Sequence, residues 1–206
     1  MRSASQLAWL EETTAQAERA LDQALTYLTG RGISEAAARR ARLGVVDTQV
    51  RTAGSAKYRG RLTIPYLTPA GVVNLKFRSM DGADPKYLCL PNSKPLLYGV
   101  QSFFADGDTI AVTEGELDAL ILTHEVGLPA VGCPGVSTWQ EHHPRCFTGY
   151  ERVLVFADGD GPGFDLAKRI GRDLDQAQVI AMPDGMDVTD VFLTEGAAGL
   201  KGRAGL

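Results

Sequence analysis

The pattern of apolar and polar residues changes character near residue 100. After Gly99, short apolar runs alternate with stretches in which apolar residues recur at helical spacing. The apolar runs predict strands at 109–113, 129–131, 153–157 and 178–181. The helical spacing predicts helices at 116–126, 139–146, 164–170 and 188–193. Strands that alternate with helices indicate an α/β fold with a parallel, doubly wound sheet.

The residues before Gly99 have a different, mixed pattern. Apolar residues at helical spacing over 17–28 and a serine-capped segment over 35–43 predict a helical hairpin. Two strands follow at 62–67 and 72–78, joined by a short turn that contains proline and glycine. We therefore expect a smaller α+β subdomain ahead of the parallel sheet.

Charge divides the chain at the same place, although the net charge is only −4. Residues 30–100 carry 12 Lys and Arg against 4 Asp and Glu, whereas residues 101–206 carry 7 against 17. This predicts a basic N-terminal domain over 1–100, an acidic α/β domain over 101–195 and a small, polar, flexible tail over 196–206. A basic half fits phosphate binding and an acidic half fits metal binding, but both also fit ordinary solvated surfaces.

The composition and the spacing of the cysteines indicate where the protein acts and whether it binds zinc. No segment approaches the roughly 20 apolar residues of a membrane span, and the N-terminus has no signal-peptide pattern. Cys133, His142, His143 and Cys146 match no usual zinc module, and the three cysteines form no Cys-x-x-Cys pair. We expect a cytoplasmic protein with no membrane partner and no structural zinc.

Carboxylates follow three of the predicted strands. Glu114 comes directly after the first strand, and Asp158 and Asp160 follow the third. Asp187 lies in the segment after the fourth, and Asp118 is four residues beyond Glu114. Right-handed crossovers bring these strand ends to one edge of the sheet, where oxygen ligands suit Mg²⁺ or Mn²⁺. Each carboxylate could instead be a loop residue or a helix N-cap.

These motifs, in this order, resemble the catalytic core of DnaG-type primases, which contains a Toprim domain. EGELD at 114–118 is similar to the family motif EGYxD, and DGDGPG at 158–163 is similar to DGDxAG. The stretches that follow the order of the core's basic half are 58–66, 71–78, 85–88 and 97–99. The resemblance covers roughly residues 25–195.

The resemblance implies roles for individual residues. Those implied to bind divalent metal are Glu114, Asp118, Asp158, Asp160 and Asp187, with Asp118 in support and Glu114, Asp158 and Asp160 as the catalytic residues. Those implied to bind template or nucleotide are Arg61, Arg78, Lys86 and Lys94. One motif departs from the family, because DPD is replaced by DVT at 187–189.

The function implied is that of a DNA primase in DNA replication, a DNA-directed RNA polymerase and nucleotidyltransferase that makes RNA primers. Its substrates would be single-stranded DNA and ribonucleoside triphosphates, with Mg²⁺ or Mn²⁺ as cofactor. The family's zinc-binding and helicase-binding domains are not recognised in this chain, which implies a separate zinc-binding protein or a replicative helicase as partner. Such a core would suit a compact phage genome, acting in the host cytoplasm.

Two other functions remain open from the sequence. One is a Toprim-type metal-dependent nuclease, against which the primase-like motifs of the basic half argue. The other is a non-catalytic nucleic-acid-binding module, against which the intact set of Glu114, Asp158 and Asp160 argues.

Overall fold

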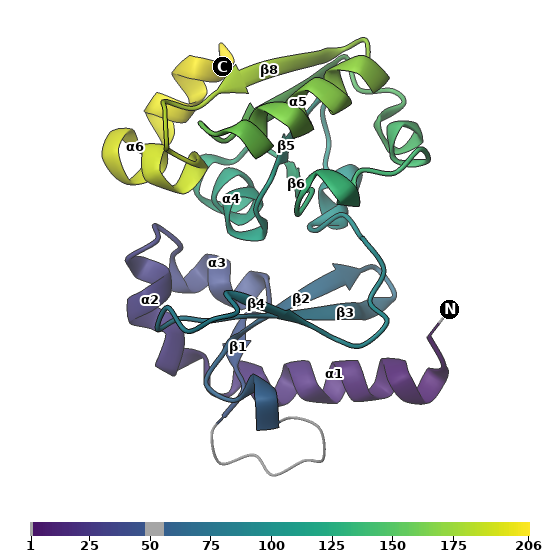
Figure 1. Ribbon diagram of the computed structural model, residues 1–206, viewed down its shortest axis with the longest axis vertical. Coiled ribbons are helices and arrows are strands. Elements are labelled where there is room, and N and C mark those ends of the chain that lie inside the picture. The colour runs from purple at the N-terminus through teal and green to yellow at the C-terminus, as the bar shows by residue number, and fades with distance from the viewer. Residues whose placement is uncertain (1, 48–55) are drawn as a thin grey trace. The chain divides into compact units, whose positions relative to one another are not determined.

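The chain folds as two compact units, Met1–Lys94 and Pro95–Leu206. The computed structural model describes residues 2–47 and 56–206 (Figure 1). The boundary falls before the expected position at residue 100, because Leu97 and Tyr98 belong to the second unit. Leu97 is buried in its core, and Tyr98 pairs with Gly132 in an antiparallel bridge.

The helical part of the first unit is more divided than the sequence pattern predicts. The helix expected over 17–28 is a 3₁₀ turn at Leu21–Ala24 followed by α2 (Leu25–Thr29). The second expected helix, α3 (Glu35–Arg40), begins at its serine cap as predicted but ends earlier. Ahead of them lies an unpredicted helix, α1 (Ala4–Glu18).

The sheet of the first unit is antiparallel, with strand order β1-β2-β3-β4. Its strands are β1 (Gly44–Val45), β2 (Leu62–Thr68), β3 (Gly71–Arg78) and β4 (Tyr87–Cys89). The hairpin of β2 and β3 confirms the prediction, whereas the two short outer strands were not expected. Helix α1 packs on this sheet, and Tyr58 stacks on Phe77 in the core between them with ring centroids 3.9 Å apart.

The second unit confirms the parallel sheet, with strand order β6-β5-β7-β8. Its strands are β5 (Thr109–Thr113), β6 (Ala130–Gly132), β7 (Arg152–Ala157) and β8 (Ala177–Ala181). Nearly every residue of β5, β6 and β7 is buried, whichever face of the sheet it lies on. This is the burial expected of a sheet with helices on both faces.

Three helices accompany this sheet (Figure 1). They are α4 (Glu116–Leu120), which continues as a π-helical segment over Ile121–Val126, α5 (Gly161–Asp173) and α6 (Val188–Ala204). The helix expected over 139–146 is wrong, because 3₁₀ turns at Val136–Thr138 and His143–Phe147 flank an extended Trp139. His143 is followed by Pro144, which has no backbone N–H to donate to a regular helix.

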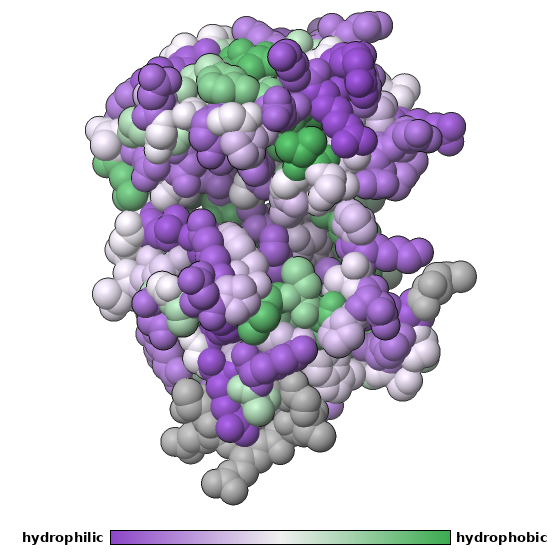
Figure 2. All heavy atoms as spheres, in the orientation of Figure 1, coloured by the Kyte–Doolittle hydropathy of each residue, from purple (hydrophilic) through white to green (hydrophobic). Residues whose placement is uncertain are grey.

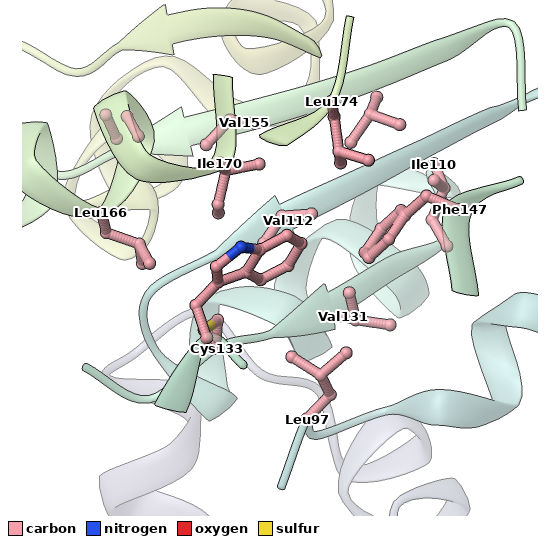
Figure 3. Packing of buried hydrophobic residues seen from close by; sticks show 14 residues of the cluster. Leu97, Ile110, Val112, Val131, Cys133, Phe147, Val155, Leu166, Ile170 and Leu174 are labelled. Atoms are coloured by element: carbon pink, nitrogen blue, oxygen red, sulfur yellow. The ribbon is translucent and has the colours of Figure 1, made fainter. Parts of the chain in front are cut away.

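The core of the second unit fixes the strand ends from which the site is built. Side chains of α5, among them Ile170, meet Val112 of β5 and Val155 of β7 (Figure 3). Trp139 and Phe147 are fully buried in the same cluster. The indole nitrogen of Trp139 donates to Asp173 at 3.0 Å and so ties the 3₁₀ region to the end of α5.

The flexible tail expected over 196–206 is wrong, because α6 continues to Ala204. Gly196 breaks the helix with a φ of 68°, and a second helical stretch then buries Leu200 and Ala204. Arg152 donates to the carbonyl of Ala204 at 2.9 Å and holds this end against β7. Leu200 and Leu206 are the two large apolar residues in 196–206, and most of the others are glycines and alanines, so the segment carries no clear periodic signal.

Among residues 2–47 and 56–206, no helix has both the length and the apolar character needed to cross a bilayer. On the face shown in Figure 2, apolar side chains form small separate patches among polar ones.

Candidate active site

The acidic residues singled out in the sequence follow adjacent strands of the parallel sheet. Glu114 comes directly after β5, Asp158 comes directly after β7, and Asp187 caps the helix that follows β8. Since β5, β7 and β8 are neighbours and run parallel, their carboxyl ends share one edge. The structure therefore brings these carboxylates to one edge, as the sequence predicts.

Electrostatics show how close the carboxylates are to one another. Burial and then the negative charges of neighbouring carboxylates raise the pKa of Asp158 to about 8; these neighbours are Asp118, Glu114, Asp187 and Asp160. Burial, followed by the charge of Asp160, also raises the pKa of Glu114. The charges of the other four predicted acidic residues thus all act on Asp158, and we call these five residues the acidic cluster.

Two members of the acidic cluster also serve as helix N-caps. Oδ1 of Asp160 accepts a hydrogen bond from the Gly163 amide at 2.9 Å at the start of α5. Oδ1 of Asp187 accepts one from the Asp190 amide at 2.8 Å, and Oδ2 of Asp190 accepts one from the Asp187 amide at 3.1 Å. The caps fix both side chains where the positive end of a helix dipole favours negative charge.

Asp118 has a partner that the sequence analysis missed. The hydroxyl and the amide of Thr189 both donate to Oδ1 of Asp118, at 2.8 and 3.1 Å. A signal was present in the sequence, because Thr189 occupies the position of the second aspartate in the family motif DPD. Asp190, the next residue along the chain, is exposed and belongs to the capping box of α6.

The donor set of the acidic cluster fits a hard divalent cation. Oε2 of Glu114 and Oδ1 of Asp158 are buried without a hydrogen-bond partner among the described residues. In residues 2–47 and 56–206, no three His, Cys, Asp or Glu side chains stand ready to hold a metal ion as they are now arranged. Buried carboxylate oxygens that repel one another are costly, and a cation with oxygen ligands would relieve that cost.

The basic residues singled out in the sequence all lie in the first unit. Arg78 is only 6% exposed, and its guanidinium donates to the hydroxyls of Tyr27 and Tyr87, the former at 2.6 Å. Lys86 is exposed, with Nζ 5.9 Å from the Tyr87 ring centroid, and Lys76, not predicted as a site residue, lies 4.3 Å from the same centroid. We call Lys76, Arg78 and Lys86 around Tyr87 the tyrosine-centred basic cluster.

The other two predicted basic residues are placed differently. Arg61 donates to the carbonyl of Pro85 at 2.8 Å, which fixes its guanidinium beside the segment that carries Lys86. Lys94 is exposed at the end of the first unit.

The raised pKa of Asp158 predicts a pH-dependent stability in the absence of divalent cations. The usual value is 3.8, so between that pH and about 8 the unfolded chain releases a proton that the folded chain retains. Stability should therefore fall as pH rises through this window and level off above it. The melting temperature in EDTA, measured from pH 6.5 to 9, should fall for the wild type.

The same series with Asp158→Asn should lose much of this slope, whereas the exposed Asp165→Asn on α5 should keep it. Starting at pH 6.5 avoids His143, whose pKa burial lowers to about 4 and which acts with the opposite sign at lower pH. A wild-type melting temperature that rises across the window would contradict the prediction.

The chain has relatives among known proteins. No protein-family model matches the chain. The Gene 57 protein of Mycobacterium phage D29 is 38% identical over 151 residues, which cover 71% of this chain and 99% of that protein. The DNA primase of Salmonella typhimurium is 28% identical over 166 residues, and the match spans 71% of this chain but only 28% of the primase.

Among solved structures, a DnaG primase catalytic domain bound to single-stranded DNA has the same fold. The TM-score is 0.80 at 22% sequence identity, and the match covers 98% of this chain and 78% of that domain. The relative from phage D29 is matched along almost its whole length, whereas the chain spans only about a quarter of the length of the DNA primase from Salmonella typhimurium. The chain belongs to the family of DnaG-type DNA primase catalytic cores.

Proposed function

We propose that this chain is a primase core, which synthesises short RNA primers on single-stranded DNA in the host cytoplasm. The observation that carries the proposal is the acidic cluster, with buried oxygens of Glu114 and Asp158 that have no hydrogen-bond partner among the described residues. Family membership supports it, because the relatives include DNA primases.

Glu114, Asp158, Asp160 and Asp187 would hold the cation, with Asp118 in support. A bound Mg²⁺ or Mn²⁺ lowers the pKa of an attacking hydroxyl and neutralises charge on a leaving pyrophosphate. Oxygen-only donors at a strand edge are typical of sites for these two ions, and they do not decide between them.

In the proposed reaction, the 3′-hydroxyl of the growing primer attacks the α-phosphate of a ribonucleoside triphosphate. The new phosphodiester bond forms as the bond to pyrophosphate breaks, and the hydroxyl proton leaves to solvent. The caps on α5 and α6 hold the side chains of Asp160 and Asp187 at the helix N-termini, where the helix dipoles favour their negative charge. Glu114 and Asp158 directly follow β5 and β7, whose apolar residues pack in the core of the second unit.

The tyrosine-centred basic cluster, together with Arg61 and Lys94, would hold template and triphosphate through their phosphates. The hydroxyls of Tyr27 and Tyr87 fix the guanidinium of Arg78, while Lys86 keeps an exposed ammonium group. Binding through phosphates releases counterions and therefore weakens steeply with salt.

Lys86→Ala is expected to weaken binding of single-stranded DNA by about three- to tenfold and to lower the salt slope by about 0.7. The exposed side chain supports no core contact, so the melting temperature and Mg²⁺ affinity should stay at wild-type values. Fluorescence anisotropy over a salt series measures the affinity for single-stranded DNA and its salt slope, and calorimetry measures Mg²⁺ binding. Lys201→Ala, exposed on α6, is the matched control, and a collapse of Mg²⁺ affinity in Lys86→Ala would contradict the assignment.

We also propose a zinc-binding protein or a replicative helicase as partner. Starting a primer requires two free nucleotides to be held together, and a tethered partner raises effective concentration without supplying a catalytic group. Adding such a partner should increase dinucleotide formation more than it increases extension of an annealed primer.

One experiment tests the proposed function against its alternatives. The protein is incubated with single-stranded DNA, labelled ribonucleotides and Mg²⁺ or Mn²⁺, and the products are separated on a gel. Incorporation of label supports the primase. Cutting of the DNA without incorporation would establish a nuclease instead, and neither product would leave a binding module.

A further inference from the structure

A pair of hydrogen bonds crosses the edge of the sheet at which the acidic cluster lies. Asp118 is on α4, which follows β5, and Thr189 is on α6, which follows β8. Strand β7, which Asp158 directly follows, lies between those two strands. The two bonds from Thr189 to Oδ1 of Asp118 therefore join the outer sides of the cluster, and both residues are buried, at 6% and 2% exposure.

The other oxygen of Asp118 is also closely packed. A methyl group added at Gly115 would lie 2.1 Å from Oδ2 of Asp118, so the carboxylate rests directly on the backbone of that glycine. With Oδ1 bound to Thr189 and Oδ2 against Gly115, the side chain is held from both ends. Its orientation is set by the protein before any ligand arrives.

The charge of Asp118 matters to the rest of the acidic cluster. Among the neighbouring charges, that of Asp118 has the largest effect on the pKa of Asp158, ahead of those of Glu114 and Asp187. Where DnaG-type primases usually carry the second aspartate of DPD, this chain carries Thr189, which supplies a hydroxyl donor and removes one negative charge. Asp190 does not replace that aspartate, because its carboxylate caps α6.

We propose that Thr189 is a positioning residue, which clamps Asp118 as an oriented negative charge behind the metal ligands. Oδ1 of Asp118 then serves as the acceptor of this clamp and does not coordinate the cation. Because Asp187 is two residues before Thr189 and Glu114 is four before Asp118, the clamp also fixes the spacing of these two ligands. The inference rests on the metal site of the proposed function and deepens it.

Thr189→Val tests the clamp, since valine keeps the shape and removes the hydroxyl. We expect the melting temperature in EDTA to fall by about 4–8 °C, because a buried carboxylate loses one donor. We expect the Kd for Mg²⁺, measured by calorimetry, to rise about tenfold, as it does when a group that orients a ligand is removed. Thr189→Ser keeps the hydroxyl and should restore both values.

Thr194→Val is the matched control on the same helix. The hydroxyl of Thr194 donates to the backbone carbonyls of Asp190 and Val191 within its own helix, at 2.9 and 3.2 Å. Its side chain is exposed. It should leave Mg²⁺ affinity unchanged. Wild-type affinity and melting temperature in Thr189→Val would overturn the inference, and so would an equal loss of affinity in Thr194→Val.

Thr189→Asp provides a second measurement if the valine variant does not fold. A carboxylate against Asp118 should lower the melting temperature in EDTA, and Mg²⁺ should raise it by more than it raises that of the wild type. An equal rise in both proteins would overturn the inference. Failure of the proposed function is a separate result, namely a wild type that binds Mg²⁺ but incorporates no nucleotide.

Discussion

Asp158→Asn is expected to abolish primer synthesis while the fold survives. The substitution removes the carboxylate that lies directly after β7, within range of four other acidic residues, and changes little volume. Loss of one preorganised charged group of this kind costs about 10²–10³ in rate. Incorporation of labelled ribonucleotide on single-stranded DNA measures the effect, with circular dichroism to establish the fold.

The same variant should be more stable than the wild type when no divalent cation is present. At pH 8 the wild-type site holds carboxylates that repel one another, and asparagine removes one of those charges. The melting temperature in EDTA should therefore rise, and the rise on adding Mg²⁺ should shrink. Asp165→Asn, exposed on α5, should show neither change, and near-normal synthesis by Asp158→Asn would contradict the assignment of Asp158 to the site.

The parallel sheet and its acidic edge could be predicted because each depends on local sequence. Strand β5 begins and ends where the apolar run does, and β7 differs from its predicted range by one residue. A strand buried on both faces is a continuous apolar run, and the polar residues that end it mark the edge of the sheet. The right hand of the crossovers then places those residues together.

Elements that depend on distant contacts could not be predicted in this way. The buried stripe of α1 includes Thr14, a polar residue whose hydroxyl is satisfied by the carbonyl of Leu10 at 2.8 Å within the same helix. Strands β1 and β4 are two and three residues long, too short for alternation to appear. Their pairing is defined by β2 and β3, which already form a hairpin.

Two side chains of the candidate sites also have contacts that could not be predicted from the sequence. The sequence singles out Arg78, but only the fold shows that its guanidinium is buried and donates to two tyrosine hydroxyls. The partner of Asp118 is Thr189, 71 residues away along the chain. A hydroxyl in a helix carries no sign of which carboxylate it will meet.

Residues 158–160, between β7 and α5, form a short segment that we call the acidic loop. Gly159→Ala is expected to be the substitution in this loop that destabilises the fold most. A methyl group at this position would lie 1.9 Å from the carbonyl oxygen of Pro183 and 2.7 Å from its carbonyl carbon, both of them backbone atoms. The Gly159 amide donates to the carbonyl of Met186 at 2.8 Å, and the Gly185 amide donates to the carbonyl of Gly159 at 2.8 Å. The loop after β7 is thus joined to the loop after β8.

Because neither backbone can move without breaking these bonds, we expect Gly159→Ala to lower the free energy of unfolding by about 3 kcal/mol or more. Mg²⁺ affinity should fall with it, since the joined loops set the distance between Asp158 and Asp187. Gly161→Ala is the matched control two residues away, at the first position of α5 with no atom within 4 Å of the added methyl. Alanine favours a helix, so this variant should stay within about 1 kcal/mol of the wild type. Urea unfolding with and without Mg²⁺ compares the two, and equal stability would show that the close approach at Gly159 does not hold the acidic loop in place.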